Sequence, residues 1–320
     1  MRQLHLYILI FFIGFTSSCK KDLLHFSNVQ KIESGSDTDR LNKVVFVDAN
    51  NGFIAGGKWY TEAVILTTHD GGNTWQRKSF TNVGQLLNSV SVAPSGTVYG
   101  TGFEGKLMYS NDTGKTWVYK QLEHYWFRDV AETTPGKVIA VGGISFGSGM
   151  RQILDTNTTL YKRDSLTYQL NAIHMVTPNT GYICGFGIVL KTTDGGNTWA
   201  IQNVKDDNFM AMDIHGDEMW MCGNNGSIYH TTDAGIDWTR QRNGNDITLK
   251  SYHVLSILFK DQLNGWAVGE NGVVLHSEDG GNHWMEYDQF TTNTLTSLSL
   301  CSDGRLLVVG DNGSIYKLTL

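Results

Sequence analysis

The sequence predicts an all-β protein, a seven-bladed β-propeller of four-stranded blades, from three observations. A turn motif in which Asp is followed five residues later by a large apolar residue, as in "DGGNTW", recurs at intervals of 39 to 46 residues. An apolar segment ending in glycine, such as "WAVG" or "LLVVG", occurs seven times. The 36 glycines, 3 prolines and 9 tryptophans suit short strands joined by tight turns. Periods of about 40–45 residues are typical of propeller blades.

The first 18 residues have the pattern of an export signal. Arg2 supplies the positive charge, and residues 6–15 form an uncharged apolar run that is shorter than the roughly 20 residues a membrane span needs. Small residues then precede Cys19, in a pattern that resembles a bacterial lipobox, so we expect Cys19 to become the lipidated first residue. Thr16 stands where that pattern usually has leucine, so ordinary cleavage after Ser18 is the alternative.

The signal defines the expected organisation of the chain. Residues 1–18 are the signal peptide, residues 19–24 a short tether behind the lipid anchor, and residues 25–320 a single propeller. A lipid anchor holds a protein at a membrane without spanning it. We therefore expect a monomeric lipoprotein of the cell envelope, periplasmic or exposed at the surface.

One unit, residues 170–204, shows the expected order of strands within a blade. "LNAIHMV" alternates as an inner strand, "YICG" and "IVLKT" follow across turns, and "TWAIQNV" is the outer strand. The last unit, which begins at "LTSLSL", ends after its third strand. We expect residues 25–35 to supply its outer strand, because a closed ring leaves only short protected strand edges.

The repeated turns are interpreted as structural because a catalytic aspartate would not recur at the period of a blade. Asp carboxylates accept backbone N–H bonds in turns, and the tryptophan is expected to pack between blades. The third copy, "DTNTTL", lacks both the Gly-Gly pair and the tryptophan. The predicted structural residues are Asp70, Trp75, Asp112, Trp117, Asp155, Asp194, Trp199, Asp233, Trp238, Asp279 and Trp284.

Charge and cysteine content argue against several classes of function. The formal net charge is -6, without the basic clusters that a nucleic-acid binder needs. After Cys19 the chain has Cys184, Cys222 and Cys301, which we expect to be buried thiols. No paired Cys/His spacing indicates a metal site, and nothing in the sequence indicates a cofactor.

The turns resemble the Asp-box (BNR) repeat, S/T-x-D-x-G-x-T-W. "GWAVGENGVVLHSEDGGNHW" at residues 265–284 resembles more narrowly the photosystem II assembly and stability factor family of seven-bladed propellers. The resemblance covers about residues 40–320 and implies a non-enzymatic assembly factor or scaffold. The basic partner-binding patch of that family is not carried over, because no motif in this chain fixes its positions.

Two other functions are weighed against a protein-binding module. Sialidases also carry Asp-boxes, and they need an arginine triad and a tyrosine nucleophile; such Tyr chemistry is an exception among glycosidases. Arg40, Arg128 and Arg151 are the arginines considered for that triad, and "FRDV" is the nearest match to the sialidase Phe/Tyr-Arg-Ile-Pro motif. A carbohydrate-binding surface protein is the other alternative.

The candidate binding residues come from enlarged connections on one face. The second-to-third-strand loops are extended in blades one and three, as "GGKWYTEA" and "GGISFGSGMRQ", whereas four other blades keep a minimal glycine turn. Aromatic residues with arginine are the usual composition of binding hot spots for a protein or glycan; packing between blades is the alternative. The candidates are Trp59, Tyr60, His124, Tyr125, Trp126, Arg128, Phe146, Arg151 and Tyr252.

Overall fold

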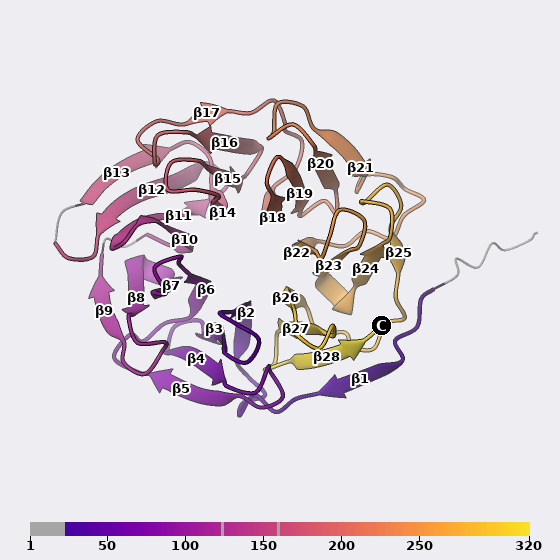
Figure 1. Cartoon of the computed structure of the whole chain (residues 1–320), viewed down its shortest axis with the longest axis horizontal. Helices are drawn as coiled ribbons and strands as arrows, with labels where there is room; N and C mark the ends of the chain where they lie inside the picture. The colour runs from indigo at the N-terminus through magenta and orange to yellow at the C-terminus, as the bar shows by residue number, and fades with distance from the viewer. Residues whose placement is uncertain (1–22, 123–124, 159–160) are drawn as a thin grey trace, which may run out of the picture.

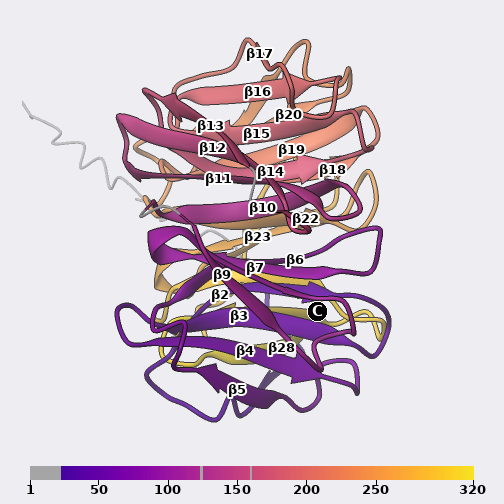
Figure 2. The same ribbon diagram turned by 90° about the vertical axis from the view of Figure 1, so that its left-hand side faces the viewer.

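The computed structural model describes residues 23–122, 125–158 and 161–320. Seven four-stranded antiparallel sheets, each of them one blade, are arranged in a ring with their inner strands towards its centre (Figure 1). Seen from the side, the strands of successive blades lie one beneath another around the disc (Figure 2). The predicted seven-bladed propeller is confirmed. Within the described ranges no helix has both the length and the hydropathy to cross a membrane.

The strands of each blade follow one another in chain order from the centre of the ring outward, except in blade seven. Blade one consists of β2 (Arg40–Phe46), β3 (Gly52–Lys58), β4 (Glu62–Thr68) and β5 (Gln76–Phe80). Blade two consists of β6 (Leu87–Val92), β7 (Val98–Gly102), β8 (Lys106–Ser110) and β9 (Val118–Gln121). Blade three consists of β10 (Phe127–Thr134), β11 (Lys137–Ser145), β12 (Ser148–Asp155) and β13 (Tyr161–Leu166). Blade four consists of β14 (Leu170–Met175), β15 (Gly181–Gly185), β16 (Ile188–Thr192) and β17 (Ala200–Ile201). Blade five consists of β18 (Phe209–His215), β19 (Glu218–Gly223), β20 (Ile228–Thr231) and β21 (Thr239–Arg242). Blade six consists of β22 (Val254–Phe259), β23 (Gly265–Gly269), β24 (Val274–Ser277) and β25 (Met285–Glu286). Blade seven consists of β26 (Leu295–Leu300), β27 (Leu306–Gly310), β28 (Ile315–Thr319) and β1 (Asn28–Lys31). Two single-turn 3-10 helices, η1 (Phe103–Gly105) and η2 (Glu270–Gly272), replace the second hairpin loop in blades two and six.

Ring closure occurs as predicted, because β1 pairs antiparallel with β28 as the outer strand of blade seven. Ile32 follows β1 and is buried in the core shared by blades one and seven. The preceding residues already lie on the protein: Leu24 forms a bridge to Tyr287 of blade six, and Phe26 stacks on the Tyr287 ring at 4.0 Å. Cys19 and the rest of the predicted tether up to residue 22 lie outside the described residues.

A glycine at or near the end of each second strand allows the close approach of the inner and second strands of a blade. A Cβ on Gly185 would lie 2.0 Å from the carbonyl oxygen of Gln169, the residue before the inner strand, and one on Gly269 would lie 1.8 Å from the carbonyl oxygen of His253. No other residue fits there without moving the backbone. The apolar run ending in glycine is therefore a packing requirement repeated around the ring.

The Asp-boxes form the outer hairpins of the blades that carry them. Asp194 accepts the backbone N–H of Thr198 at 2.9 Å and its hydroxyl at 2.6 Å, and these bonds hold the pKa of Asp194 at about 2. Trp199 packs against the core between blades three and four, and its indole N–H donates to the Gly196 carbonyl at 2.9 Å. In the divergent third copy, Asp155 accepts the backbone N–H of Asn157 at 2.9 Å, and residues 159–160 of this copy lie outside the described ranges.

Cys184, Cys222 and Cys301 are free and buried, as expected.

The enlarged connections of blades one and three differ from the prediction, because they are longer strands rather than longer loops. β11 has nine residues and β12 has eight, and their pairing continues to Ser145 opposite Ser148. Two residues, Phe146 and Gly147, are left to turn the chain.

Candidate functional site at the channel mouth

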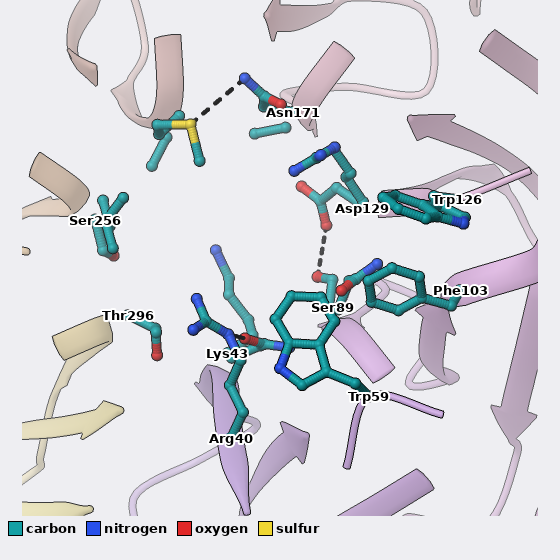
Figure 3. A pocket seen from close by; sticks show the side chains of 17 residues that line it. Arg40, Lys43, Trp59, Ser89, Phe103, Trp126, Asp129, Asn171, Ser256 and Thr296 are labelled. Atoms are coloured by element: carbon teal, nitrogen blue, oxygen red, sulfur yellow. Dashed lines mark hydrogen bonds between the residues drawn. The ribbon is translucent and has the colours of Figure 1, made fainter. Parts of the chain in front are cut away.

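A cavity of about 230 Å³ opens at the centre of the face on which the inner strands begin, here called the loop face (Figure 3). Every inner strand has a register shift near its start, after the second residue in β2 and after the first residue in the other six, so that one residue is skipped in the pairing. Such bulges redirect side chains. The skipped residues form a ring around the cavity: Asn42, Asn88, Arg128, Asn171, Met210, Leu255 and Thr296.

Most polar members of this ring join one blade to the next. The amides of Asn42, Asn88 and Asn171 donate to the carbonyl of the first inner-strand residue of the following blade at 2.7 to 2.8 Å. Thr296 makes the equivalent bond to Leu41 across the closure of the ring. Arg128 is the charged member of the seven and does not make this bond; it donates instead to the side chain of Gln169 at 3.3 Å.

Arg128 is a mostly buried cation without an acidic partner among the described residues. Its Nε atom is buried and has no hydrogen-bond partner there. Burial lowers the pKa of Arg128 to about 10, so its guanidinium remains charged at neutral pH. An unpaired buried charge is unfavourable unless something compensates it.

The other charges of the cavity leave an excess of positive charge. Arg40 is paired with Asp311 at 2.7 Å, whereas Lys43 makes no hydrogen bond or ion pair within the described part of the chain. Asp129 is the carboxylate of the lining, and its oxygens are already occupied by Ser89 and by the backbone N–H groups of Val130 and Ile173. The mouth is therefore suited to an anionic group from a partner, although the chain as a whole is acidic.

Aromatic side chains form one side of the mouth. The Phe103 ring packs between Trp59 and Trp126, with ring centroids 5.1 and 4.6 Å apart. Trp59 is 47% exposed, and the Arg40 guanidinium lies 5.6 Å from its ring centroid. Figure 3 shows the three rings on one side of the cavity, with the Arg40 and Lys43 side chains beside them.

The structure places the predicted candidates in different environments. Trp59, Trp126 and Arg128 line the mouth, while Tyr60 and Phe146 are exposed on the hairpin tips of blades one and three. Tyr125 is half-buried beneath the Arg163 guanidinium. His124 lies outside the described residues.

Two candidates are not on the surface, and for them the prediction was wrong. Arg151 lies in β12, where strand alternation turns it inward to pair with Asp164 and to pack over the Trp199 ring. Tyr252 is buried under Arg242, and burial raises the pKa of its hydroxyl to about 12. The arginine triad considered for a sialidase is therefore not assembled, because only Arg40 and Arg128 share the cavity.

Three residues of this face were missed from the sequence. Lys43 follows the bulge of its inner strand, and Phe103 lies in a tight turn that looked minimal. Phe186 occupies the short hairpin of blade four and stacks on Phe146, with ring centroids 4.8 Å apart. A comparison of the seven inner strands position by position would have marked Lys43, whereas the contact between Phe146 and Phe186 depends on how two blades face each other.

Fold and site together define a closed Asp-box propeller with a basic, aromatic-sided channel mouth. The sequence matches the photosynthesis system II assembly factor YCF48 family over residues 27–143 and 161–248. The chain belongs to this family, which confirms the resemblance seen in its Asp-boxes.

The chain is also similar to individual members of the family. A photosystem II assembly lipoprotein Ycf48 from Synechococcus sp. (strain CC9902) is 27% identical over 111 residues, which are 32% of this chain and 33% of that relative. The solved structure of YCF48 bound to D1 peptide has 17% identity and a TM-score of 0.71, covering 94% of this chain and 99% of the other. YCF48 from Cyanidioschyzon merolae has 16% identity and a TM-score of 0.69, covering 91% and 98%.

The same fold occurs in an enzyme. A streptogramin B lyase has 13% identity and a TM-score of 0.72, covering 92% of this chain and 97% of its own. At these identities the structural likenesses establish the fold alone. Function must be argued from the residues of the mouth.

Proposed function

We propose that this protein is an exported, lipid-anchored and non-enzymatic propeller that binds a protein partner on its loop face. The channel mouth is the centre of the binding surface, and a carboxylate of the partner is the group that it receives. One observation carries the proposal: Arg128 is mostly buried, charged and without an acidic partner in the described structure. Arginine is well suited to carboxylates because its fork of N–H donors binds both oxygens.

The repeat itself supports a role for Arg128 beyond the fold. At the same ring position, Asn42, Asn88 and Asn171 each donate a hydrogen bond to the next blade. An asparagine at position 128 would serve the architecture in the same way. The arginine gives up that bond and introduces a charge, a cost that a bound anionic group compensates.

The aromatic side of the mouth supports a macromolecular partner rather than a free ion. Trp59, Phe103 and Trp126 place apolar surface directly beside the cations. Aromatic and arginine residues dominate the energetics of protein interfaces. A relative has been solved in complex with D1 peptide, which is a property of that relative; for this chain the proposal is limited to a protein segment of unassigned sequence.

The test is photo-crosslinking in native membranes, with the crosslinker placed at Tyr60 beside the mouth and the captured proteins identified by mass spectrometry. Arg128→Asn restores the residue found in three other blades, and we expect it to abolish capture while the melting temperature is retained. Arg240→Asn, which removes an exposed arginine from the outer strand of blade five, is the matched control and should capture as the wild type does. Unchanged capture by Arg128→Asn would refute a binding centre at the mouth.

A glycan array and a fluorogenic sialoside, run on the same proteins, test the alternatives. Binding to glycans that Arg128→Asn abolishes would replace the protein partner with a carbohydrate. Sialoside turnover by the wild type would overturn the non-enzymatic assignment.

A further inference from the structure

A pair of exposed phenylalanines lies beside the mouth on the loop face. Phe146 is at the hairpin tip of blade three and is 55% exposed; Phe186 is at the hairpin tip of blade four and is 44% exposed. Their rings stack with an interplanar angle of 25°. Ile144, on the same tip as Phe146, is also exposed. Contiguous apolar surface of this kind marks an interaction site in a soluble protein.

Gln169 connects this pair to the buried cation. Its backbone N–H donates to the Phe146 carbonyl at 3.1 Å, and its own carbonyl accepts the Phe186 N–H at 2.9 Å. Its side-chain oxygen accepts from Arg128 at 3.3 Å. Gln169 is itself buried and further held by Asn171. The bases of both phenylalanines and the guanidinium are thus fixed to a single residue.

We infer that Phe146, Phe186 and Arg128 form one composite subsite that selects a protein segment with a large apolar side chain next to a carboxylate. This inference rests on the proposed function and specifies what the partner must carry. The carboxylate compensates the charge of Arg128, and the neighbouring apolar side chain covers the two rings. Gln169 is a positioning residue because it sets the spacing between the two parts.

The polar alternative for this surface is less consistent with its composition. The hairpin tips across the ring carry Asn224 in blade five, Asn271 in blade six and Asn312 in blade seven, so the apolar tips are confined to one side of the mouth. A sugar would need hydrogen-bonding groups beside the aromatic rings, and the carbonyl of Phe146 and the N–H of Phe186 are already paired with the backbone of Gln169. An apolar side chain needs no such groups.

The test uses a defined peptide array in which two adjacent variable residues lie within a fixed glycine-serine frame, probed with residues 23–320 displayed as a biotin–streptavidin tetramer. We expect the strongest binding where Asp or Glu stands beside Phe, Leu, Met or Trp. Three soluble peptides then follow from the best pair: the pair itself, its amide variant with Asn or Gln, and its variant with Ala in place of the apolar residue. Their affinities are measured by fluorescence anisotropy.

Each part of the subsite has its own expected signature in these measurements. Phe146→Ala and Phe186→Ala should each weaken binding of the peptide with the full pair by about tenfold, which is the loss of one hot-spot contact. Neither variant should change the affinity for the Ala-substituted peptide. Arg128→Asn should weaken binding of both the peptide with the full pair and the Ala-substituted peptide, and it should leave the affinity for the amide peptide unchanged. Ile236→Ala removes an exposed apolar residue from the Asp-box hairpin of blade five and serves as the control, with no expected loss. Tyr60→Ala tests instead whether the apolar contact lies on the tip of blade one.

The outcomes separate this inference from the proposed function. If acidic peptides bind in an Arg128-dependent way but the apolar neighbour and the two phenylalanines have no effect, the composite subsite is refuted and the mouth remains a carboxylate site. If no acidic peptide on the array depends on Arg128, both are refuted. If Tyr60→Ala loses as much affinity as Phe146→Ala, the apolar contact lies on blade one and the inference is again wrong.

Discussion

The closure of the ring by the first strand can be tested with a single side-chain truncation. Ile32 follows β1, is 6% exposed and packs in the core shared by blades one and seven. Its backbone N–H donates to the Ile315 carbonyl at 2.9 Å, and this bond survives truncation of the side chain. Ile32→Ala therefore removes buried apolar contact between the N-terminal segment and blade seven without removing the strand pairing.

The expected magnitude follows from burial. Truncation of a buried isoleucine to alanine costs about 2–5 kcal/mol, and we expect a value in that range. Val29 lies three residues earlier, within β1 itself, and is 37% exposed. Val29→Ala is the matched control, and an exposed site of this kind should change stability by less than about 0.5 kcal/mol.

The assay is guanidinium denaturation followed by tryptophan fluorescence, with both variants and the wild type compared at the same protein concentration. Size-exclusion chromatography accompanies it, because release of β1 would expose the edge of β28 and promote association through strand pairing. Equal stability of Ile32→Ala and Val29→Ala would show that the N-terminal segment does not close the ring in solution.

Two further predictions concern the Asp-boxes. The pKa of Asp112 and that of Asp194 are held at about 2 by threonine hydroxyl and backbone N–H bonds. Their contribution to stability is therefore present above the unfolded pKa of about 3.9 and is lost as the pH falls towards 2. Asp194→Asn should show a shallower loss of melting temperature between pH 5 and pH 2, and an unchanged slope would contradict this. The indole N–H of Trp199 donates a hydrogen bond to Gly196, whereas that of Trp75 is buried and unpaired within the described residues. In denaturant titrations, Trp199→Phe should therefore lower the free energy of unfolding by about 1 kcal/mol more than Trp75→Phe does. The reverse order would show that cavity size, not the hydrogen bond, decides the cost.

The fold was predictable because each of its elements is written several times. A box such as that from Asp194 to Trp199 recurs in most blades with the same hairpin role, and the glycine at Gly185 recurs because the backbone of the inner strand leaves no room for a Cβ. Repetition averages out the ambiguity of any single short strand. Closure by β1 followed from counting strands in an incomplete last unit.

The site was predictable only in part, for reasons that lie in strand geometry. Arg128 and Trp59 were found from their residue types. Lys43 was missed because its place after a bulge shows only when the seven inner strands are compared position by position. Arg151 was misplaced because a segment interpreted as a loop continues as a strand and turns that side chain inward. Direction within an irregular hairpin depends on register, and a shift of one residue exchanges the inner and outer faces.

The closed repeat offers its own standard for deciding which residues serve function. Each position of the mouth is occupied seven times under nearly the same geometric demands, so a residue that serves the ring alone should resemble its equivalents in other blades. Asn42, Asn88 and Asn171 meet that standard, since each joins its blade to the next. Arg128 does not: like Met210 and Leu255 it makes no joining bond, but unlike them it places an uncompensated charge at the same point of the ring. Because stability alone would favour asparagine there, the arginine indicates a demand from outside the fold, and its excess positive charge indicates the sign of what must bind.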